Sequence, residues 1–144
     1  MPIYADTSFL VPAYSPEEDS IKVLRWFQRA RDGLPFTPLH RLELRTALRL
    51  RVFRGEITST QGSEAFREIN SDLIDNILVH TPIVWTEAFR QAEELAAKHA
   101  ETLGNRTSDL LHVAIARTLK AREFLTLDSR QKRLAVAAGM KVKP

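Results

Sequence analysis

The chain contains no cysteine, and none of its apolar runs approaches the roughly 18 residues that a transmembrane helix needs. The absence of cysteine excludes a disulfide framework, a cysteine-ligated zinc site and thiol chemistry. The first residues carry neither a basic segment nor an apolar core of the secretory kind, so no export signal is expected. We therefore expect a cytoplasmic protein without a membrane partner.

Glycine and proline are scarce, with five and seven residues, and they nowhere cluster into a linker. The chain shows no internal repeat, and its 144 residues correspond to about one domain, predicted to span residues 1–144. Hydrophobic residues make up 44% and charged residues 27%, which excludes a disordered or fibrous chain. The net charge of +3 is compatible with a polyanionic partner but does not establish one.

Short apolar runs alternate with longer segments of helical periodicity. The apolar runs predict strands at residues 3–5, 34–37, 79–84, 123–127 and 140–142. The helical patterns predict helices that begin near residue 15 and that cover residues 38–54, 60–78, 86–103, 109–121 and 130–138. Ser15, followed by Pro16 and Glu18, has the form of a helix-capping box, and Gly104 is a helix stop. This alternation is typical of an α/β domain with a mainly parallel sheet, in which residues 123–127 are the central strand.

The predicted helix at residues 38–54 has two apolar sides. One stripe, predicted to face inward, consists of Leu39, Leu42, Thr46, Leu50 and Phe53. Glu43 falls inside that stripe, where a carboxylate needs an arginine partner or a metal ion. A second side carries Leu44 and Leu48, which we expect the following helix to cover. The alternative is a groove for a second copy of the chain or for another partner.

Three further carboxylates stand out by position. Asp6 and Asp128 each follow directly on a predicted strand, and ligands bind at the carboxyl ends of parallel strands. Asp109 begins the most apolar helix. Each of the three can instead cap or begin a helix. If the fold assembles them with Glu43, their hard oxygen ligands favour Mg²⁺ or Mn²⁺, which serve phosphodiester hydrolysis.

Four segments carry a resemblance to a known family. They are residues 4–10 (YADTSFL), 40–48 (HRLELRTAL), 107–116 (TSDLLHVAIA) and 125–128 (LTLD). In this order and spacing they resemble the successive motifs of PIN-domain proteins, and the chain length resembles VapC-type toxins of toxin–antitoxin pairs. The resemblance implies a three-layer α/β/α fold and a magnesium-dependent ribonuclease with a VapB-like antitoxin as partner. It places Asp6, Glu43, Asp109 and Asp128 at the acidic metal positions, and Ser8 beside the metal.

Several other side chains are candidates for contacts with substrate. Arg106 and Arg130, with Lys132 and Arg133, lie near the acidic positions in sequence and are candidates to hold an RNA backbone. A row of Arg41, Arg45 and Arg49 is either a solvated helix face or a contact for RNA phosphates or an acidic antitoxin segment. His112 either has a functional role, in orienting a carboxylate or contacting substrate, or is a hydrogen-bonded core residue. Trp26 and Trp85 are assigned to packing.

The leading hypothesis is therefore a metal-dependent endoribonuclease toxin, with a homodimer left open. The alternative is a non-catalytic PIN-like module that binds RNA or protein, although all four acidic positions are filled. A phosphotransferase with Asp6 as its nucleophile is disfavoured, because Ser8 stands where the haloacid-dehalogenase pattern needs a second aspartate. A receiver-type phosphoacceptor is disfavoured by the position of Asp6 after the first strand.

Overall fold

The structure is a computed structural model that describes residues 2–144, and it divides into two compact units. One unit comprises the residues up to 6 together with residues 82–144, and the other comprises residues 7–81. Every strand pair in both units is parallel, which confirms the predicted α/β class. That residues 1–144 form a single domain stays a prediction. Within the described part of the chain, no helix combines the length and the apolar character that a membrane crossing requires.

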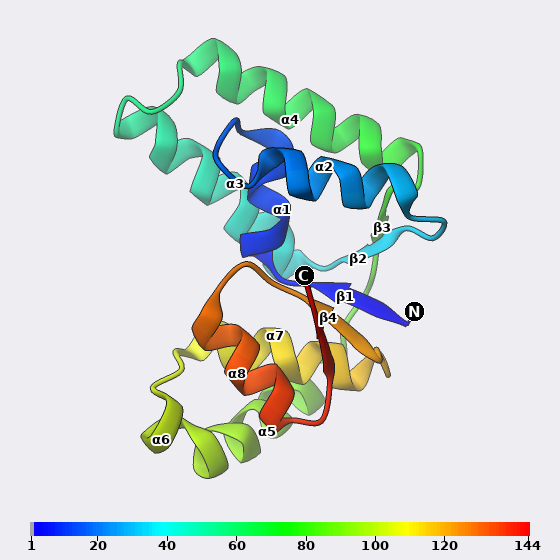
Figure 1. The fold of residues 1–144 in the computed structure, drawn as a ribbon, viewed down its shortest axis with the longest axis vertical. Coiled ribbons are helices and arrows are strands. Elements are labelled where there is room, and N and C mark those ends of the chain that lie inside the picture. Colours follow the sequence, from blue (N-terminus) through cyan, green and yellow to red (C-terminus); the bar gives the residue numbers. More distant parts are fainter. Residues whose placement is uncertain (1) are drawn as a thin grey trace. The chain divides into compact units, whose positions relative to one another are not determined.

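The first unit is built on a three-stranded sheet in the order β1-β4-β5. Its strands are β1 (Ile3–Ala5), β4 (Glu123–Leu125) and β5 (Lys141–Lys143), so the predicted central strand is confirmed. Its helices are α5 (Trp85–Leu95), the π-helical segment η1 (Ala96–Ala100), α6 (Glu101–Leu103), α7 (Thr107–Thr118) and α8 (Ser129–Ala137). Helices α5 and α7 pack side by side (Figure 1).

Helix α7 is the core element of this unit. Its residues 110–116 are all buried, as the uniformly apolar sequence predicts. The segment before it ends at Gly104, whose φ of +69° is the left-handed conformation that a glycine adopts most easily. Helix α5 begins at Trp85, one residue before the predicted start at residue 86.

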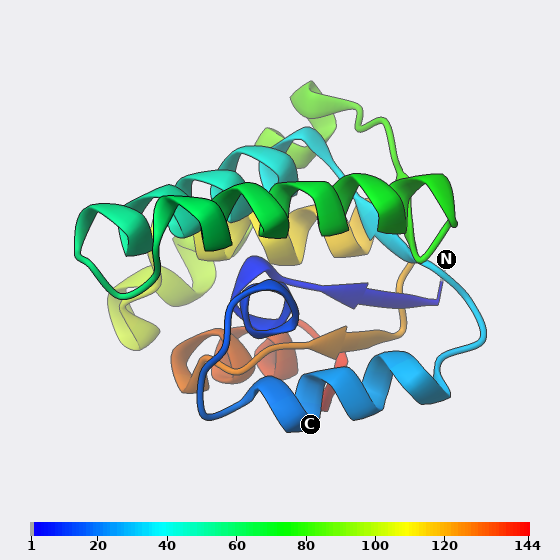
Figure 2. The same cartoon turned by 90° about the horizontal axis from the view of Figure 1, so that it is seen from above.

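The second unit contains a parallel pair of strands and four helices among its described residues. The strands are β2 (Leu34–Phe36) and β3 (Leu78–His80). The helices are α1 (Thr7–Tyr14), α2 (Ser20–Arg29), α3 (Pro38–Phe53) and α4 (Ser59–Ile74). Helices α3 and α4 form an antiparallel hairpin whose turn contains Gly55 at a φ of +73° (Figures 1 and 2).

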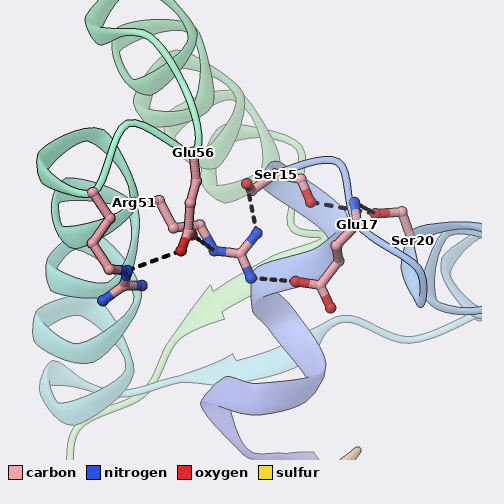
Figure 3. Close-up of polar contacts among 6 residues, drawn as sticks. Ser15, Glu17, Ser20, Arg51 and Glu56 are labelled. Carbon is pink, nitrogen blue, oxygen red and sulfur yellow. Dashed lines mark hydrogen bonds and ion pairs between the residues drawn. The ribbon is translucent and has the colours of Figure 1, made fainter.

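The start of this unit differs from the prediction. Residues 7–14 form helix α1, which the sequence pattern did not predict because Pro12 lies within it. The capping box predicted at Ser15 is wrong, since α2 begins only at Ser20. The reason is a competing cation: the guanidinium of Arg51 donates to Ser15 Oγ at 2.9 Å and is paired with Glu17 (Figure 3). The loop between α1 and α2 is therefore tied to the end of α3.

The buried side of α3 is the opposite of the predicted one. Leu44 and Leu48 are fully buried, while Leu42 is 67% and Phe53 86% exposed. The groove alternative for this side is wrong, because both leucines are wholly buried within the chain. Helix α3 packs against both α1 and α4, so the buried side is decided by tertiary packing that the periodicity of a single helix does not reveal. That α4 in particular covers the two leucines stays a prediction.

Trp26, the tryptophan of this unit that was assigned to packing, does pack against other aromatic side chains. Trp26 makes edge-to-face contacts with Phe9 and Phe27 at centroid distances of 5.6 and 5.3 Å. In the other unit, Trp85 is half-buried beside Phe89 on α5.

At two glycines of the second unit, substitution by alanine is expected to have opposite effects on the free energy of unfolding. A Cβ on Gly33 would lie 2.3 Å from the Asn76 carbonyl oxygen, a backbone atom that has no room to move. We expect Gly33→Ala to lower the free energy of unfolding by about 1–3 kcal/mol.

A Cβ on Gly62, inside α4, would lie 3.1 Å from the end of the Val52 side chain, which can shift. Alanine also improves helix propensity by about 0.8–1.0 kcal/mol, so Gly62→Ala should be neutral or stabilising. Urea unfolding of both variants measures the difference, and equal destabilisation would contradict this packing.

Candidate functional site

The carboxyl ends of β1 and β4 place Asp6 next to Thr126. The backbone N–H of Asp6 donates to the Leu125 carbonyl at 3.0 Å, which extends the parallel ladder by one residue. Beyond that point the Thr126 hydroxyl donates to Asp6 Oδ2 at 2.6 Å. Both side chains are only 4% exposed, so this hydrogen bond holds a buried carboxylate in one orientation.

Thr126 also controls the start of α8. Its Oγ1 accepts a hydrogen bond from the Asp128 backbone N–H at 3.1 Å. Asp128 then caps α8, because its Oδ1 accepts from the N–H groups of Arg130 and Gln131 at 2.8 and 3.3 Å. One hydroxyl therefore connects the carboxylate of Asp6 with the loop that carries the carboxylate of Asp128.

Asp109 lies in the first turn of α7, where its Oδ2 accepts from the Arg106 N–H at 3.0 Å. Two side-chain amides fasten this turn to the first turn of α8. Gln131 Nε2 donates to the Asp109 carbonyl at 3.2 Å, and Asn105 Nδ2 donates to the Arg130 carbonyl at 3.3 Å. The N-terminal ends of α7 and α8 are therefore held together.

A cavity of about 310 Å³ lies where these two helices begin. It is lined by Arg106, Ser108, Asp109, Asp128, Ser129, Arg130 and Arg133. The structure thus brings together five of the predicted residues, the two aspartates and the arginines at 106, 130 and 133. The cavity presents carboxylates, hydroxyls and guanidinium groups on one wall, together with the partial positive charge of two helix N-termini.

The predicted residues of the other unit are Glu43 and Ser8. Glu43 lies on α3, half-buried, and accepts a hydrogen bond from the Thr7 hydroxyl at 2.8 Å. Ser8 is the second residue of α1 and is half-buried.

His112 is a core histidine. Its ring is 3% exposed, and its Nδ1 lies 2.7 Å from the Tyr4 hydroxyl. The ring also packs at 5.8 Å from the Tyr4 ring, within the layer between α7 and the sheet. These contacts support the packing role that was one of the two expectations for this residue.

The donor chemistry of the cavity suits a hard divalent cation. Asp109 and Asp128 each use one oxygen for a backbone N–H, and among the described residues no hydrogen bond engages the other. Two carboxylate oxygens and the serine hydroxyls are ligands that Mg²⁺ and Mn²⁺ prefer. Within residues 2–144, however, the structure holds no ready-made group of three or more His, Cys, Asp or Glu side chains able to hold a metal.

The sequence analysis missed Thr126 and Gln131. A signal for Gln131 was present, because a glutamine on the inward face of the last helix must find a polar partner, and it is 1% exposed. Thr126 sits within a quoted motif, but its partner lies 120 residues away in the chain, so no local pattern reveals the hydrogen bond.

Comparisons with known proteins agree on one fold. A family model described as PIN domain matches residues 3–137, and no curated protein sequence matches the chain. The structure superposes on VapC20 of Mycobacterium tuberculosis, described as a sarcin–ricin loop cleaving toxin, with a TM-score of 0.70, 17% identity and 99% coverage of both chains. FitAcB of Neisseria gonorrhoeae gives a TM-score of 0.69 at 18% identity, covering 99% of this chain and 96% of that one. VapBC-1 of nontypeable Haemophilus influenzae gives 0.64 at 15% identity, covering 99% and 97%.

The bridging role of Thr126 predicts a specific loss of stability. Thr126→Val keeps the side-chain shape but removes both hydrogen bonds of the hydroxyl, so we expect the free energy of unfolding to fall by about 1–3 kcal/mol. Thr126→Ser keeps the hydroxyl and should restore most of that loss.

The matched control is Thr118→Val, which removes a half-buried hydroxyl that donates to the Ile115 carbonyl within α7. Urea unfolding compares the three variants. If Thr126→Val lowers the free energy of unfolding no more than Thr118→Val does, the hydrogen bonds of Thr126 contribute no more to stability than an ordinary hydroxyl bond within a helix.

Proposed function

The chain belongs to the PIN domain family, and on that basis we propose that it is a divalent-metal-dependent endoribonuclease that hydrolyses RNA phosphodiester bonds. The observation that carries the proposal is the cavity at the start of α7 and α8, where two carboxylates stand beside three arginines. A phosphodiester substrate needs both, since the carboxylates can hold a cation and the arginines can bind phosphate oxygens.

We propose that Asp6, Glu43, Asp109 and Asp128 are the metal-holding and catalytic carboxylates. Support comes from their positions in the family's motifs and from the hydrogen bonds that fix three of them. Asp6 is oriented by Thr126, and Asp128 and Asp109 are oriented by backbone N–H groups of α8 and α7. A bound Mg²⁺ or Mn²⁺ would supply a water of lowered pKa as the nucleophile and would neutralise charge on the phosphate.

The remaining polar residues of the cavity are proposed to bind the substrate. Arg106 and Arg130 offer planar pairs of N–H donors to phosphate oxygens, and Arg133 adds a third cation. Ser8 is proposed to lie beside the metal, as the family resemblance implies. The N-termini of α7 and α8 favour the same anionic group, because the aligned peptide dipoles leave partial positive charge at these helix ends.

The similarity to toxin structures and to toxin–antitoxin pairs supports a biological role. We propose that the chain is the toxin of such a pair, that a VapB-like antitoxin inhibits it, and that it acts in the cytoplasm. A homodimer is also proposed, although the leucine side of α3 first considered for it is buried; the exposed Leu42, Leu50 and Phe53 are one apolar surface that could serve instead.

Replacing Asp109 with asparagine tests the cavity directly. The variant keeps a hydrogen-bond acceptor for the Arg106 N–H but removes the charge, so it should fold and lose metal-dependent RNA cleavage. The loss should exceed the roughly 10- to 100-fold that removal of an outer-shell partner causes at a metal site. Cleavage of a mixed-sequence single-stranded RNA in Mg²⁺, Mn²⁺ and EDTA measures it.

Thermal unfolding gives a second readout on the same protein. Bound metal at about 100 times its dissociation constant stabilises a protein by about 2.7 kcal/mol, so millimolar Mn²⁺ should raise the Tm of the wild type by several degrees. Asp109→Asn should show little of this rise. Asp32→Asn, at an exposed site outside the cavity, is the control and should respond as the wild type does. An identical rise of Tm with Mn²⁺ in all three proteins would show that Asp109 does not take part in metal binding.

The proposed toxin role is tested by growth. Expression of the wild type without its partner should arrest growth, and Glu43→Gln at the same expression level should not. Co-expression of the small protein encoded beside it should restore growth. Normal growth with confirmed wild-type expression would refute the toxin role while leaving the cleavage test unaffected.

A further inference from the structure

Helix α3 carries a row of arginines, none of which lines the cavity. Arg41, Arg45 and Arg49 are spaced by four residues, so their side chains project from the same side of the helix about 6 Å apart along its axis. Like charges at this spacing oppose each other and destabilise a helix slightly. The row therefore brings no benefit to folding by itself.

An aromatic ring on α4 holds two of these guanidinium groups in place. The central carbon of the Arg45 guanidinium lies 5.0 Å and that of Arg49 4.6 Å from the centroid of the Phe66 ring. One Arg45 nitrogen also donates to the Asn70 side chain at 3.3 Å. Stacking of this kind orients a guanidinium while leaving its outer N–H groups for another acceptor.

The charge of the row is not neutralised within the described chain. None of the three arginines forms an ion pair among residues 2–144, and Arg45 Nε is buried without a hydrogen-bond partner. The nearby acids of α4, Glu64 and Glu68, lie about 200° around the helix from Phe66 and line cavities on its other side. Burial and the positive charges of Arg41 and Arg49 lower the pKa of Arg45 below its ordinary value.

We propose that Arg41, Arg45 and Arg49, the last two held against the Phe66 ring, form a second RNA-binding surface that contacts consecutive backbone phosphates, in addition to the arginines of the cavity. The proposal rests on the proposed function in taking RNA as the substrate. Cations that repeat at every fourth residue along one helix side suit the regularly repeating phosphates of a single strand, each of which accepts paired N–H donors. This surface would hold the strand by charge and without base specificity.

The test uses binding in place of cleavage. A fluorescent 20-nucleotide single-stranded RNA of mixed sequence is titrated with the Asp109→Asn protein in EDTA, at several salt concentrations. Adding Arg41→Gln, Arg45→Gln and Arg49→Gln should weaken binding by roughly 10- to 100-fold at 0.1 M salt. It should also reduce the slope of log affinity against log salt by about 2, since each phosphate contact of a single strand contributes roughly 0.7.

Two further variants separate charge from orientation. Arg25→Gln, Arg29→Gln and Arg31→Gln together remove the same charge from exposed positions of the same unit and should change the slope little. Phe66→Leu keeps every charge but removes the ring, so it should weaken binding several-fold with the slope nearly unchanged. Circular dichroism and thermal unfolding confirm that each variant is folded.

The outcomes are distinct. Equal slopes for the two triple variants would overturn the proposal. It would also be overturned if the Arg41, Arg45 and Arg49 variant bound RNA normally but lost binding to the co-expressed small protein, because the surface would then serve an acidic protein partner. If the wild type cleaves no RNA while the slope still falls as expected, the ribonuclease proposal fails and the RNA-binding surface stands.

Discussion

The Thr126 hydroxyl is the constraint on which the geometry of the cavity depends. It donates to the Asp6 carboxylate and accepts from the Asp128 N–H, so it sets where one strand ends and where the next helix begins. Asp128 in turn caps the first turn of α8. The Gln131 side-chain amide of that turn donates to the Asp109 carbonyl, so the position of Asp109 depends on that of α8. Loss of one hydrogen bond of the Thr126 hydroxyl would therefore change the positions of both aspartates of the cavity.

The electrostatics of the cavity explain how so much charge is tolerated there. Its lining combines two carboxylates with three guanidinium groups, and both carboxylates accept N–H groups at helix N-termini, where negative charge is favoured. The arrangement is nearly balanced before any ligand enters. The α3 row is different, because three positive charges share a helix side without a counterion among the described residues.

Local patterns predicted the elements that depend on local physics. The β4 strand, the buried α7 helix and the Gly104 helix stop follow from apolar runs and from glycine's conformational freedom. The aspartates at 109 and 128 were predicted with two alternatives, and the structure shows Asp109 in the first turn of α7 and Asp128 as the cap of α8 while both line the cavity. What failed was decided by distant partners: Arg51 takes the Ser15 hydroxyl from the predicted cap, and packing against other helices buries Leu44 in place of Leu42. Glu43 was singled out on a stripe that is largely exposed, although Glu43 itself is half-buried, so its assignment to the metal site rests on the family resemblance.

The cap that Asp128 provides has a consequence for genetics. Asp128 caps α8 and also lines the cavity. Most substitutions there would remove the helix cap together with the carboxylate, so they would lower the amount of folded protein and alter the proposed site at the same time. Alleles recovered at this position by selection against activity would mix loss of function with loss of folded protein. Asparagine and serine, which cap helices about as well as aspartate, separate the two causes. Few substitutions at Asp128 can therefore remove the carboxylate while keeping the cap of α8.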